Sequence, residues 1–388
     1  MNRKKILTTI LLCCCLAAGA QSPVTVFKSG AEGYKSFRIP AIVSLPGGQL
    51  LAFAEGRVHN AGDFGDINLV LKTSTDNGKS WSPLQVVVDY DHLQAGNPAP
   101  VVDLTDPQYP KGRIFLFYNT GNNHEGEVRK GNGLREVWYI TSTDAGAHWS
   151  APVNITTQVH RPMQPQTNSA YNFPEDWRSY ANTPGHALQF TQGRYRGRIY
   201  VAANHSAGAP QPDFTDYAAH GYYTDDHGKT FHLAATLPVP GSNESTAAEL
   251  GNNRLILNAR NQKGDKRMRI VGISNNGGHS WDSTYYDARL PDPVCEGSIL
   301  HIGWKKKKAI LAFANAADTL QRNHLTVRLS YDEGATWPVT IPVAGTDNRK
   351  GDYIAYSDLV LFRNKRLGIL YEFKGYSEIV FQQINLKQ

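Results

Sequence analysis

The sequence predicts an all-β protein, a six-bladed β-propeller, and two observations support this prediction. Stretches rich in Val, Ile, Leu, Tyr and Phe, broken by Gly, Asn and Asp, run through the 388 residues, while long apolar stretches of helical period are scarce. In addition, an eight-residue pattern, Ser/Thr-x-Asp-x-Gly-x-x-Trp/Phe, occurs five times. Repetition of a short hairpin unit is typical of proteins whose small sheets are arranged radially.

The first 20 residues are expected to be a signal peptide and not part of the fold. They combine a basic start at residues 3–5, an apolar stretch over residues 6–16 and a small-residue cleavage pattern at residues 18–20. The apolar stretch is too short for a permanent membrane span. We therefore expect a secreted or periplasmic protein in which residues 21–388 form a single domain, and we expect that domain to be a monomer.

The cysteines bear on export and on stability. Three of the four, Cys13, Cys14 and Cys15, lie in the predicted signal peptide, where lipid attachment is the alternative to free export. The residues before them are not the small ones that usually precede a lipidated cysteine. The remaining Cys295 cannot form an internal disulfide, so the fold must depend on packing and hydrogen bonds.

The charge of the chain is mildly basic. The full sequence carries a net charge of +6, and removal of three basic residues with the signal peptide leaves 37 basic and 34 acidic residues. An excess of this size suits an acidic ligand without identifying one. The basic run at residues 305–308 has no aromatic residues interleaved with it, so nucleic-acid binding is not expected.

Each copy of the octet is expected to close a hairpin. Asp-x-Gly supplies a tight turn, in which Gly accepts positive φ and Asp bonds nearby backbone, and the aromatic residue packs into the sheet. The copies span residues 74–81, 142–149, 224–231, 274–281 and 330–337. Their spacing leaves one four-stranded blade of about 40–50 residues for each copy, plus loops. Five marked blades and one unmarked closing blade give six.

These octets resemble the Asp-boxes of the sialidase (neuraminidase) superfamily, and the resemblance continues in order from Phe37 to Glu372. It implies a glycoside hydrolase, an exo-α-sialidase that removes terminal α-linked sialic acid from sialylated glycans, glycoproteins, glycolipids or oligosaccharides. It implies no required cofactor, although a structural calcium ion would be compatible. Because Asp-boxes also occur in propellers that are not enzymes, the function depends on the residues of the site.

The resemblance implies that three arginines bind the carboxylate of the substrate. Guanidinium groups pair with carboxylates in planar, bidentate fashion. The matching residues are Arg38, in the segment Ser-Phe-Arg-Ile-Pro, Arg260 and Arg322. Arg328 is the alternative for the third position, since it lies six residues further along. Arg322 is preferred because it precedes the expected strand, where a loop can reach a central cavity.

The resemblance also implies a tyrosine nucleophile, Tyr356, and its base, Glu244. A carboxylate nucleophile would be repelled by the substrate's own carboxylate, whereas a neutral phenol is not, and sialidases are known to use tyrosine. A free phenol has a pKa near ~10, so it needs a nearby base and positive charge to react at neutral pH. Tyr353 is the alternative nucleophile.

The general acid is expected from the loop that follows the second strand, and the resemblance favours Asp63 over Asp66. An acid at the leaving oxygen is needed for glycoside cleavage. By the same resemblance, Glu372 orients the first of the three arginines. Arg57 and Asp103 are expected to contact the 4-hydroxyl and N-acyl edge of the sugar, with a turn as the alternative role for the aspartate.

Two other functions remain open on the same fold. A trans-sialidase, or an intramolecular one, would use the same residues and differ in how water and acceptor reach the site; the aromatic residues between 171 and 180 either line that site or pack a loop. A binding propeller would need the arginines but not the acid, base and nucleophile. Glu296 departs from the pattern, because a neutral residue such as Gln is expected there.

Overall fold

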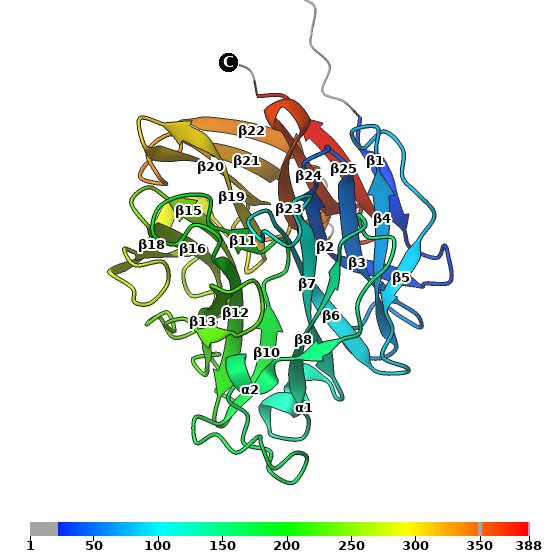
Figure 1. Ribbon diagram of the computed structural model, residues 1–388, viewed down its shortest axis with the longest axis vertical. Helices are drawn as coiled ribbons and strands as arrows, with labels where there is room; N and C mark the ends of the chain where they lie inside the picture. The colour runs from blue at the N-terminus through cyan, green and yellow to red at the C-terminus, as the bar shows by residue number, and fades with distance from the viewer. Residues whose placement is uncertain (1–21, 348–350, 387–388) are drawn as a thin grey trace, which may run out of the picture.

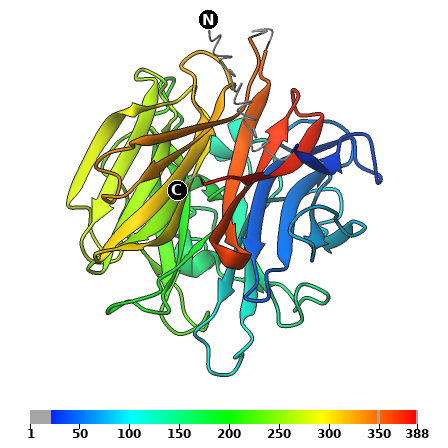
Figure 2. The ribbon, with the colours of Figure 1, turned by 90° about the horizontal axis from the view of Figure 1, so that it is seen from above.

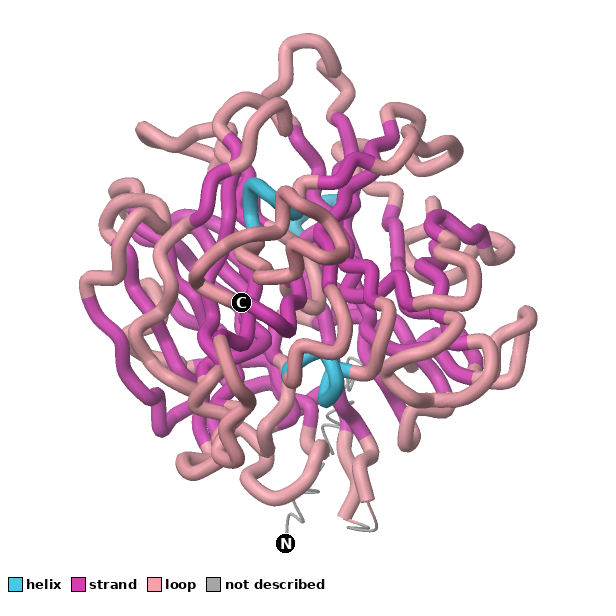
Figure 3. The backbone as a smooth tube through the Cα atoms, turned by 90° about the horizontal axis from the view of Figure 1, so that it is seen from below, coloured by secondary structure: helices cyan, strands magenta, loops and turns pink. Residues whose placement is uncertain are grey.

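The computed structural model describes residues 22–347 and 351–386, so the predicted signal peptide lies outside the described residues. Strands dominate this part of the chain (Figures 1 and 3). The helical segments are α1 (Glu125–Arg129), α2 (Thr156–Val159) and the 3-10 turn Arg363–Lys365. No helix among these residues is long and apolar enough to cross a membrane.

The first sheet contains eight strands in two antiparallel halves. The halves meet where Ile67 pairs with Gln94 in parallel. The strands are β2 (Ser36–Ser44), β3 (Leu50–Arg57), β4 (Ile67–Ser74) and β5 (Gln85–Val88) in one half, and β6 (Gln94–Asp103), β7 (Arg113–Gly121), β8 (Arg135–Ser142) and β9 (Val153–Asn154) in the other.

Three further sheets follow in chain order and are antiparallel throughout. The second contains β10 (Trp177–Asn182), β11 (Leu188–Gln189), β12 (Ile199–Ala207), β13 (Tyr217–Thr224) and β14 (His232–Leu233). The third contains β15 (Ser242–Leu250), β16 (Arg254–Asn261), β17 (Met268–Ser274) and β18 (Ser283–Pro291). The fourth contains β19 (Gly297–Lys305), β20 (Lys308–Ala316), β21 (Leu325–Ser330) and β22 (Val339–Ala344).

The last sheet joins the two ends of the described chain. It contains β23 (Ile354–Phe362), β24 (Arg366–Phe373), β25 (Glu378–Ile384) and β1 (Val24–Lys28). Strand β1 pairs antiparallel with β25, from Val24 opposite Phe381 to Lys28 opposite Glu378. Figure 2 shows this N-terminal strand beside the C-terminal strands. Pairing of the two ends within one sheet closes the ring of sheets.

The octets form the turns that the sequence predicts. In the first copy Asp76 accepts hydrogen bonds from the Ser74 hydroxyl (2.8 Å), the Ser80 amide (3.0 Å) and the Ser80 hydroxyl (2.6 Å). Gly78 and the residue before it have positive φ, and the same holds in all five copies. Each copy joins the third and fourth strands of a four-stranded unit, and the sheet of β1 and β23–β25 contains none.

The apolar core lies between neighbouring sheets, not within a single central layer. Phe53 and Leu71 of the first half-sheet, for example, pack against Leu116 and Ile140 of the second, and all four are buried. Alternate residues of each strand therefore face the next sheet around the ring.

Asp358 of β23 links several sheets near the centre of the ring. Its buried carboxylate accepts hydrogen bonds from the Ile42 amide (2.8 Å), the Ser298 hydroxyl (2.9 Å) and both the amide and Nδ1 of His186 (3.0 and 2.7 Å). Burial opposes a charge on His186, but the Asp358 carboxylate outweighs it and raises the pKa of the imidazole.

The fold prediction is confirmed as an all-β propeller. The count of blades differs, because hydrogen bonding groups the described strands into five sheets and not six. The reason is the one parallel pair between β4 and β6, which joins two otherwise separate four-stranded units.

Candidate active site

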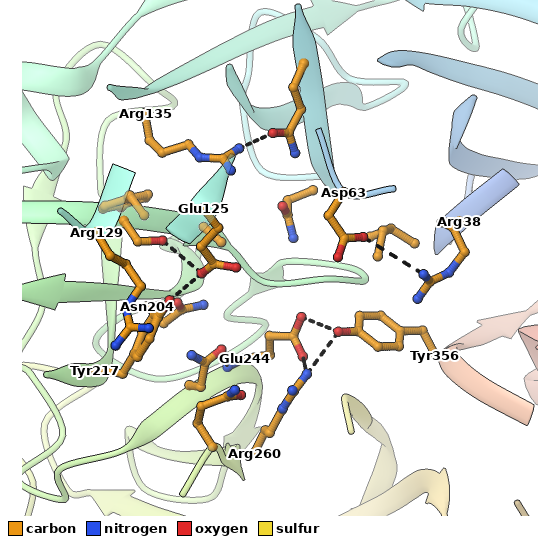
Figure 4. A pocket seen from close by; sticks show the side chains of 18 of the residues that line it. Arg38, Asp63, Glu125, Arg129, Arg135, Asn204, Tyr217, Glu244, Arg260 and Tyr356 are labelled. Carbon is orange, nitrogen blue, oxygen red and sulfur yellow. Dashed lines mark hydrogen bonds and ion pairs between the residues drawn. The ribbon is translucent and has the colours of Figure 1, made fainter. Parts of the chain in front are cut away.

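A pocket of about 320 Å³ lies where the sheets converge, and residues from four of the sheets and from the β20–β21 loop of the remaining one line it (Figure 4). Five strands that begin beside the pocket, β2, β6, β10, β15 and β23, each have an irregularity in register near their start. A β-bulge bends a strand and re-aims a side chain. The bulged segments carry pocket residues, among them Arg38, Asn97, Glu244 and Tyr356.

Tyr356 and Glu244 are in direct contact in this pocket. The Tyr356 hydroxyl lies 2.5 Å from Oε1 of Glu244, and Nη1 of Arg260 donates to the hydroxyl (3.1 Å) and to Oε2 of Glu244 (2.7 Å). Three side chains from β15, β16 and β23 thus form one closed set of hydrogen bonds (Figure 4). The sequence prediction that Tyr356, Glu244 and Arg260 share a site agrees with this geometry.

The environment of Tyr356 keeps its phenol protonated at rest. Burial, followed by the neighbouring Glu244 carboxylate, raises the pKa of Tyr356 well above its ordinary value of 10.0, while Arg260 and Arg322 act in the opposite direction. A proton can leave this phenol only if Glu244 receives it, and the two arginines then stabilise the phenolate.

Glu372 of β24 holds two site residues at once. Its Oε1 accepts from Nε of Arg38 (2.6 Å) and from the Ile39 amide (3.0 Å), and its Oε2 accepts from the Tyr356 amide (3.1 Å). Ile39 has a φ of 57°, an unfavourable conformation for a β-branched residue that this bond helps to hold. The structure thus brings together Glu372 and Arg38, the pair that the sequence predicts.

Arg322 reaches the pocket from the loop before β21, as expected. Its Nη1 donates to the Tyr376 hydroxyl (3.3 Å) and its Nη2 to the Val294 carbonyl (3.4 Å). Burial opposes the charge of Arg322, but the neighbouring Cys295, Tyr356 and Tyr376 raise its pKa, so it stays charged.

The alternatives to Arg322 and Tyr356 lie outside the pocket. Arg328 donates to Oδ1 of Asn315 (3.3 Å) within its own sheet. Tyr353 packs its ring against Phe373 at 5.3 Å between centroids.

Asp63 lies at the mouth of the pocket beside Arg57. Its Oδ1 accepts from Nη1 of Arg57 (2.7 Å) and lies 4.0 Å from Nη1 of Arg38, while 80% of its side chain is exposed. Desolvation raises the pKa of Asp63, but Arg57 and Arg38 outweigh it and hold the pKa below its ordinary value. Asp66 does not line the pocket and faces His59 and His92 instead.

Arg57 is fixed from the opposite side by a buried carboxylate. Its Nε and Nη2 donate to Oε2 of Glu55 (3.1 and 2.7 Å), and only 3% of its side chain is exposed. Oε1 of Glu55 in turn accepts from the Asn97 amide (2.9 Å). Sequence reasoning found Arg57 but missed both Glu55 and Asn97.

Asp103 is not brought together with the other predicted site residues, and the expectation that it contacts the sugar in this pocket is corrected. It ends β6, whereas Asn97 near the start of the same strand lines the pocket. The buried Asp103 carboxylate accepts from Gln189 (2.7 Å), Thr105 (2.9 Å) and His227 (2.7 Å). Strand direction is the signal that could have told Asn97 and Asp103 apart, because the pocket lies where the first strand of each unit begins and not where it ends.

The residues on the far wall of the pocket were also not predicted from the sequence (Figure 4). Glu125 of α1 accepts from the Ser179 hydroxyl (3.1 Å) and from the Tyr217 hydroxyl. Arg129, one turn later, forms a two-pronged pair with Asp216 (2.7 and 3.0 Å). The helix α1 lies in the connection before β8, Tyr217 begins β13 with Asp216 directly before it, and Ser179 lies in β10; none of these segments carries a recognisable motif.

The structure shows where the aromatic residues of 171–180 and Glu296 lie. Among the aromatic residues of 171–180, Tyr180 lines the pocket while Trp177 packs in the core beside His205, 3.5 Å between ring centroids. Glu296 is buried below Tyr356, where its Oε2 accepts from the Ser357 amide (2.9 Å) and its Oε1 has no hydrogen-bond partner. Burial raises the pKa of Glu296 well above 4.5, which favours the neutral form that the expected Gln would have.

Among the described residues, one group could hold a metal ion: Asp103, Asp106 and His227, at the opposite end of β6 from the pocket. Calcium prefers six to eight oxygen ligands, whereas this group offers two carboxylates and an imidazole. Asp106 is also paired with Arg113 (3.0 Å), whose positive charge opposes a cation. These residues do not fit the structural calcium ion that the sequence left open.

Comparison with known proteins places this chain in a family. The BNR repeat-like domain family matches residues 29–369. A sialidase of Micromonospora viridifaciens is 31% identical over 89% of this chain and 51% of its own length. An exo-alpha-sialidase of Aspergillus fumigatus is 32% identical over 78% of this chain and 70% of its own length. This chain thus spans about half of the first relative and over two thirds of the second.

Solved structures share the fold. A structure titled Hadza microbial sialidase Hz136 superposes with a TM-score of 0.77 at 23% identity, covering 94% of this chain and 68% of that chain. A leech intramolecular trans-sialidase superposes with a TM-score of 0.71 at 15% identity, covering 96% and 71% of the two chains. At these identities the likeness concerns the fold.

Proposed function

Because this chain belongs to the sialidase family, we propose that it is an exo-α-sialidase that hydrolyses terminal α-linked sialic acid from glycoconjugates. The observation that carries the proposal is the contact of Tyr356 with Glu244 inside a cluster of three arginines. A pocket that only bound an anionic sugar would need the arginines. It would have no use for a buried phenol in contact with a carboxylate.

Binding begins with the substrate's carboxylate. Arg38, Arg260 and Arg322 converge on one end of the pocket and together supply guanidinium donors for a single carboxylate. In this proposal the anomeric carbon, to which that carboxylate is attached, lies between Tyr356 and Asp63. Arg57 then lies within reach of a ring hydroxyl near Asp63.

The chemistry follows as a retaining double displacement. The Tyr356 oxygen attacks the anomeric carbon as its proton passes to Glu244, and the bond to the leaving oxygen breaks as Asp63 protonates that oxygen. Water then attacks the glycosyl-tyrosine, with Asp63 as base, and the proton on Glu244 returns to the phenolate. Sugar and aglycone are released with the anomeric configuration retained, and no cofactor is used.

The low pKa of free Asp63 is compatible with a role as acid. Its pKa is lowered by Arg57 and Arg38. An anionic substrate neutralises part of that positive field and excludes water from an otherwise exposed side chain, and both changes raise the pKa of a carboxyl. Protonation of Asp63 is thereby coupled to occupation of the site.

We also propose the number of blades, the route of export and the domain organisation. The two halves of the eight-stranded sheet count as separate blades, because among the described residues a single pair, Ile67 with Gln94, connects β4 with β6. Counting them separately gives six blades. The protein is exported by a signal peptide cleaved near Gln21. The remainder is one catalytic domain that acts as a monomer.

The test is release of a fluorescent phenol from an α-sialoside, with the products followed by proton NMR. We expect turnover, with the α-anomer of free sialic acid appearing first. An anhydro sugar, or transfer to an added acceptor, would replace hydrolysis by a trans-sialidase reaction. Binding of sialic acid without turnover would make the propeller a binding protein and refute the catalytic roles.

A further inference from the structure

Tyr376 lies between two of the three site arginines without lining the pocket itself. The centre of its ring is 4.3 Å from Cζ of Arg38, a stacking distance for a guanidinium on an aromatic face. Its hydroxyl accepts from Nη1 of Arg322 (3.3 Å) and donates to Oδ2 of Asp352 (2.7 Å). One side chain thus touches both arginines, through its face and through its edge.

Asp352 ties this arrangement back to the Arg322 backbone. Its Oδ1 accepts from the Arg322 amide (3.3 Å), and its Oδ2 lies 3.9 Å from Nε of the same residue. The donors and acceptors run in one direction, from Arg322 to the Tyr376 hydroxyl and on to the Asp352 carboxylate. The hydroxyl therefore sets the position of the Arg322 head group, which has no carboxylate closer than 3.9 Å among the described residues.

The backbone at Tyr376 is held in an unfavourable conformation. Tyr376 has a φ of 67° in the turn between β24 and β25, where a residue other than Gly pays a conformational cost. Two bonds from Ser29 hold the turn: its hydroxyl donates to the Tyr376 carbonyl (2.9 Å) and its amide to the Ser377 carbonyl (2.9 Å). Held in this left-handed backbone conformation, Tyr376 directs its ring toward the arginines.

From this arrangement we infer that Tyr376 is a positioning residue that sets the spacing and orientation of Arg38 and Arg322 for the substrate's carboxylate. This inference rests on the proposed function of the site. The ring fixes the plane of the Arg38 guanidinium, whose Nε is already taken by Glu372. Because the carboxylate is bound in both the ground state and the transition state, misplacing its clamp changes binding more than the chemical step, to which Arg322 contributes only through its longer-range effect on Tyr356.

The experiment compares Tyr376→Phe, which keeps the ring and removes the hydroxyl, with Tyr376→Leu, which removes both. The matched control is Tyr353→Phe, because the neighbouring Tyr353 hydroxyl bonds to no described residue. KM and kcat are measured on the α-sialoside reporter, and the Kd of free sialic acid is measured by calorimetry. Thermal unfolding of each variant checks the fold.

We expect Tyr376→Phe to raise KM and Kd together by about three- to tenfold, the effect of one hydrogen bond, with kcat within about twofold. Tyr376→Leu should raise both further, and Tyr353→Phe should change neither. Unchanged KM and Kd in Tyr376→Phe, or a fall in kcat at constant KM, would overturn the inference. A wild type that binds without turnover refutes the proposed hydrolysis while Kd still tests Tyr376; one that neither binds nor reacts overturns both.

Discussion

The phenolic oxygen of Tyr356 lies 2.5 Å from Oε1 of Glu244, and the two residues are 112 positions apart in the chain. A hydrogen bond between a buried phenol and a partly buried carboxylate is costly unless positive charge is near. Arg260 supplies this charge, because its Nη1 donates to the Tyr356 hydroxyl and to Oε2 of Glu244. The arrangement keeps the phenol neutral and places one carboxylate beside its proton.

Removal of the Tyr356 hydroxyl tests the nucleophile. Tyr356→Phe keeps the ring and its packing against Ile39 and Cys295 but leaves no oxygen to attack. We expect kcat on the phenyl α-sialoside to fall at least about 1,000-fold while sialic acid still binds. Tyr353→Phe serves as control and should keep wild-type kcat. Residual activity within tenfold of wild type would assign the attack to another group.

The role of Asp63 predicts a dependence on the leaving group. Asp63→Ala should lower kcat/KM by about 10²- to 10⁴-fold on a sialyl-oligosaccharide, whose leaving alkoxide needs a proton. The loss should be much smaller on a nitrophenyl sialoside, which leaves without one. Both substrates are measured with the same enzyme preparation, and Asp66→Ala is the control outside the pocket. An equal loss on both substrates contradicts general acid catalysis.

Glu372 is expected to support both activity and stability. In Glu372→Gln the buried Arg38 guanidinium loses its charged partner, and one of the three bonds to Arg38, Ile39 and Tyr356 loses its acceptor. The expected cost is about 2–3 kcal/mol of unfolding free energy, measured by urea titration, with a rise in KM. Glu127→Gln, in the exposed pair with Lys130, should leave stability unchanged. A Glu372 variant as stable as wild type would remove this carboxylate from the support of the site.

Glu296 makes stability depend on pH. In the unfolded chain its carboxyl titrates near 4.5, whereas burial raises its pKa well above that value in the fold. The folded state therefore binds the additional proton above pH 4.5, and stability falls as pH rises until the folded pKa is passed. The Glu296→Gln variant has no titrating carboxyl at this position, so it does not lose stability in this way. The difference in unfolding free energy between Glu296→Gln and wild type should therefore stay constant near pH 4 and shift in favour of the variant by up to about 1.4 kcal/mol per pH unit above it. A difference that does not change with pH would show that Glu296 is ionised in the fold.

Most of the pocket could be predicted because its residues belong to short motifs with recognisable neighbours. Arg38 lies in such a motif, and Arg322 was chosen over Arg328 because a loop before a strand can reach a central cavity, as it does. Asp103 was misplaced because the two ends of one extended segment cannot be told apart until the direction of the strand is known. Glu125 and Tyr376 carried no motif, since their positions depend on a short helix and on a turn with positive φ.

The sequence by itself determined the all-β architecture and its hairpins, because the octet is local: its serine, aspartate and glycine bond to one another within eight residues. It also predicted which arginines, which tyrosine and which glutamate lie in the pocket. Only the tertiary structure decided how these groups meet. Bulges at the starts of three strands aim Arg38, Glu244 and Tyr356 into one pocket, and Glu372 connects Arg38 to Tyr356 across more than 300 residues of chain. Such contacts depend on closure of the ring by β1 and β25, which no local pattern encodes.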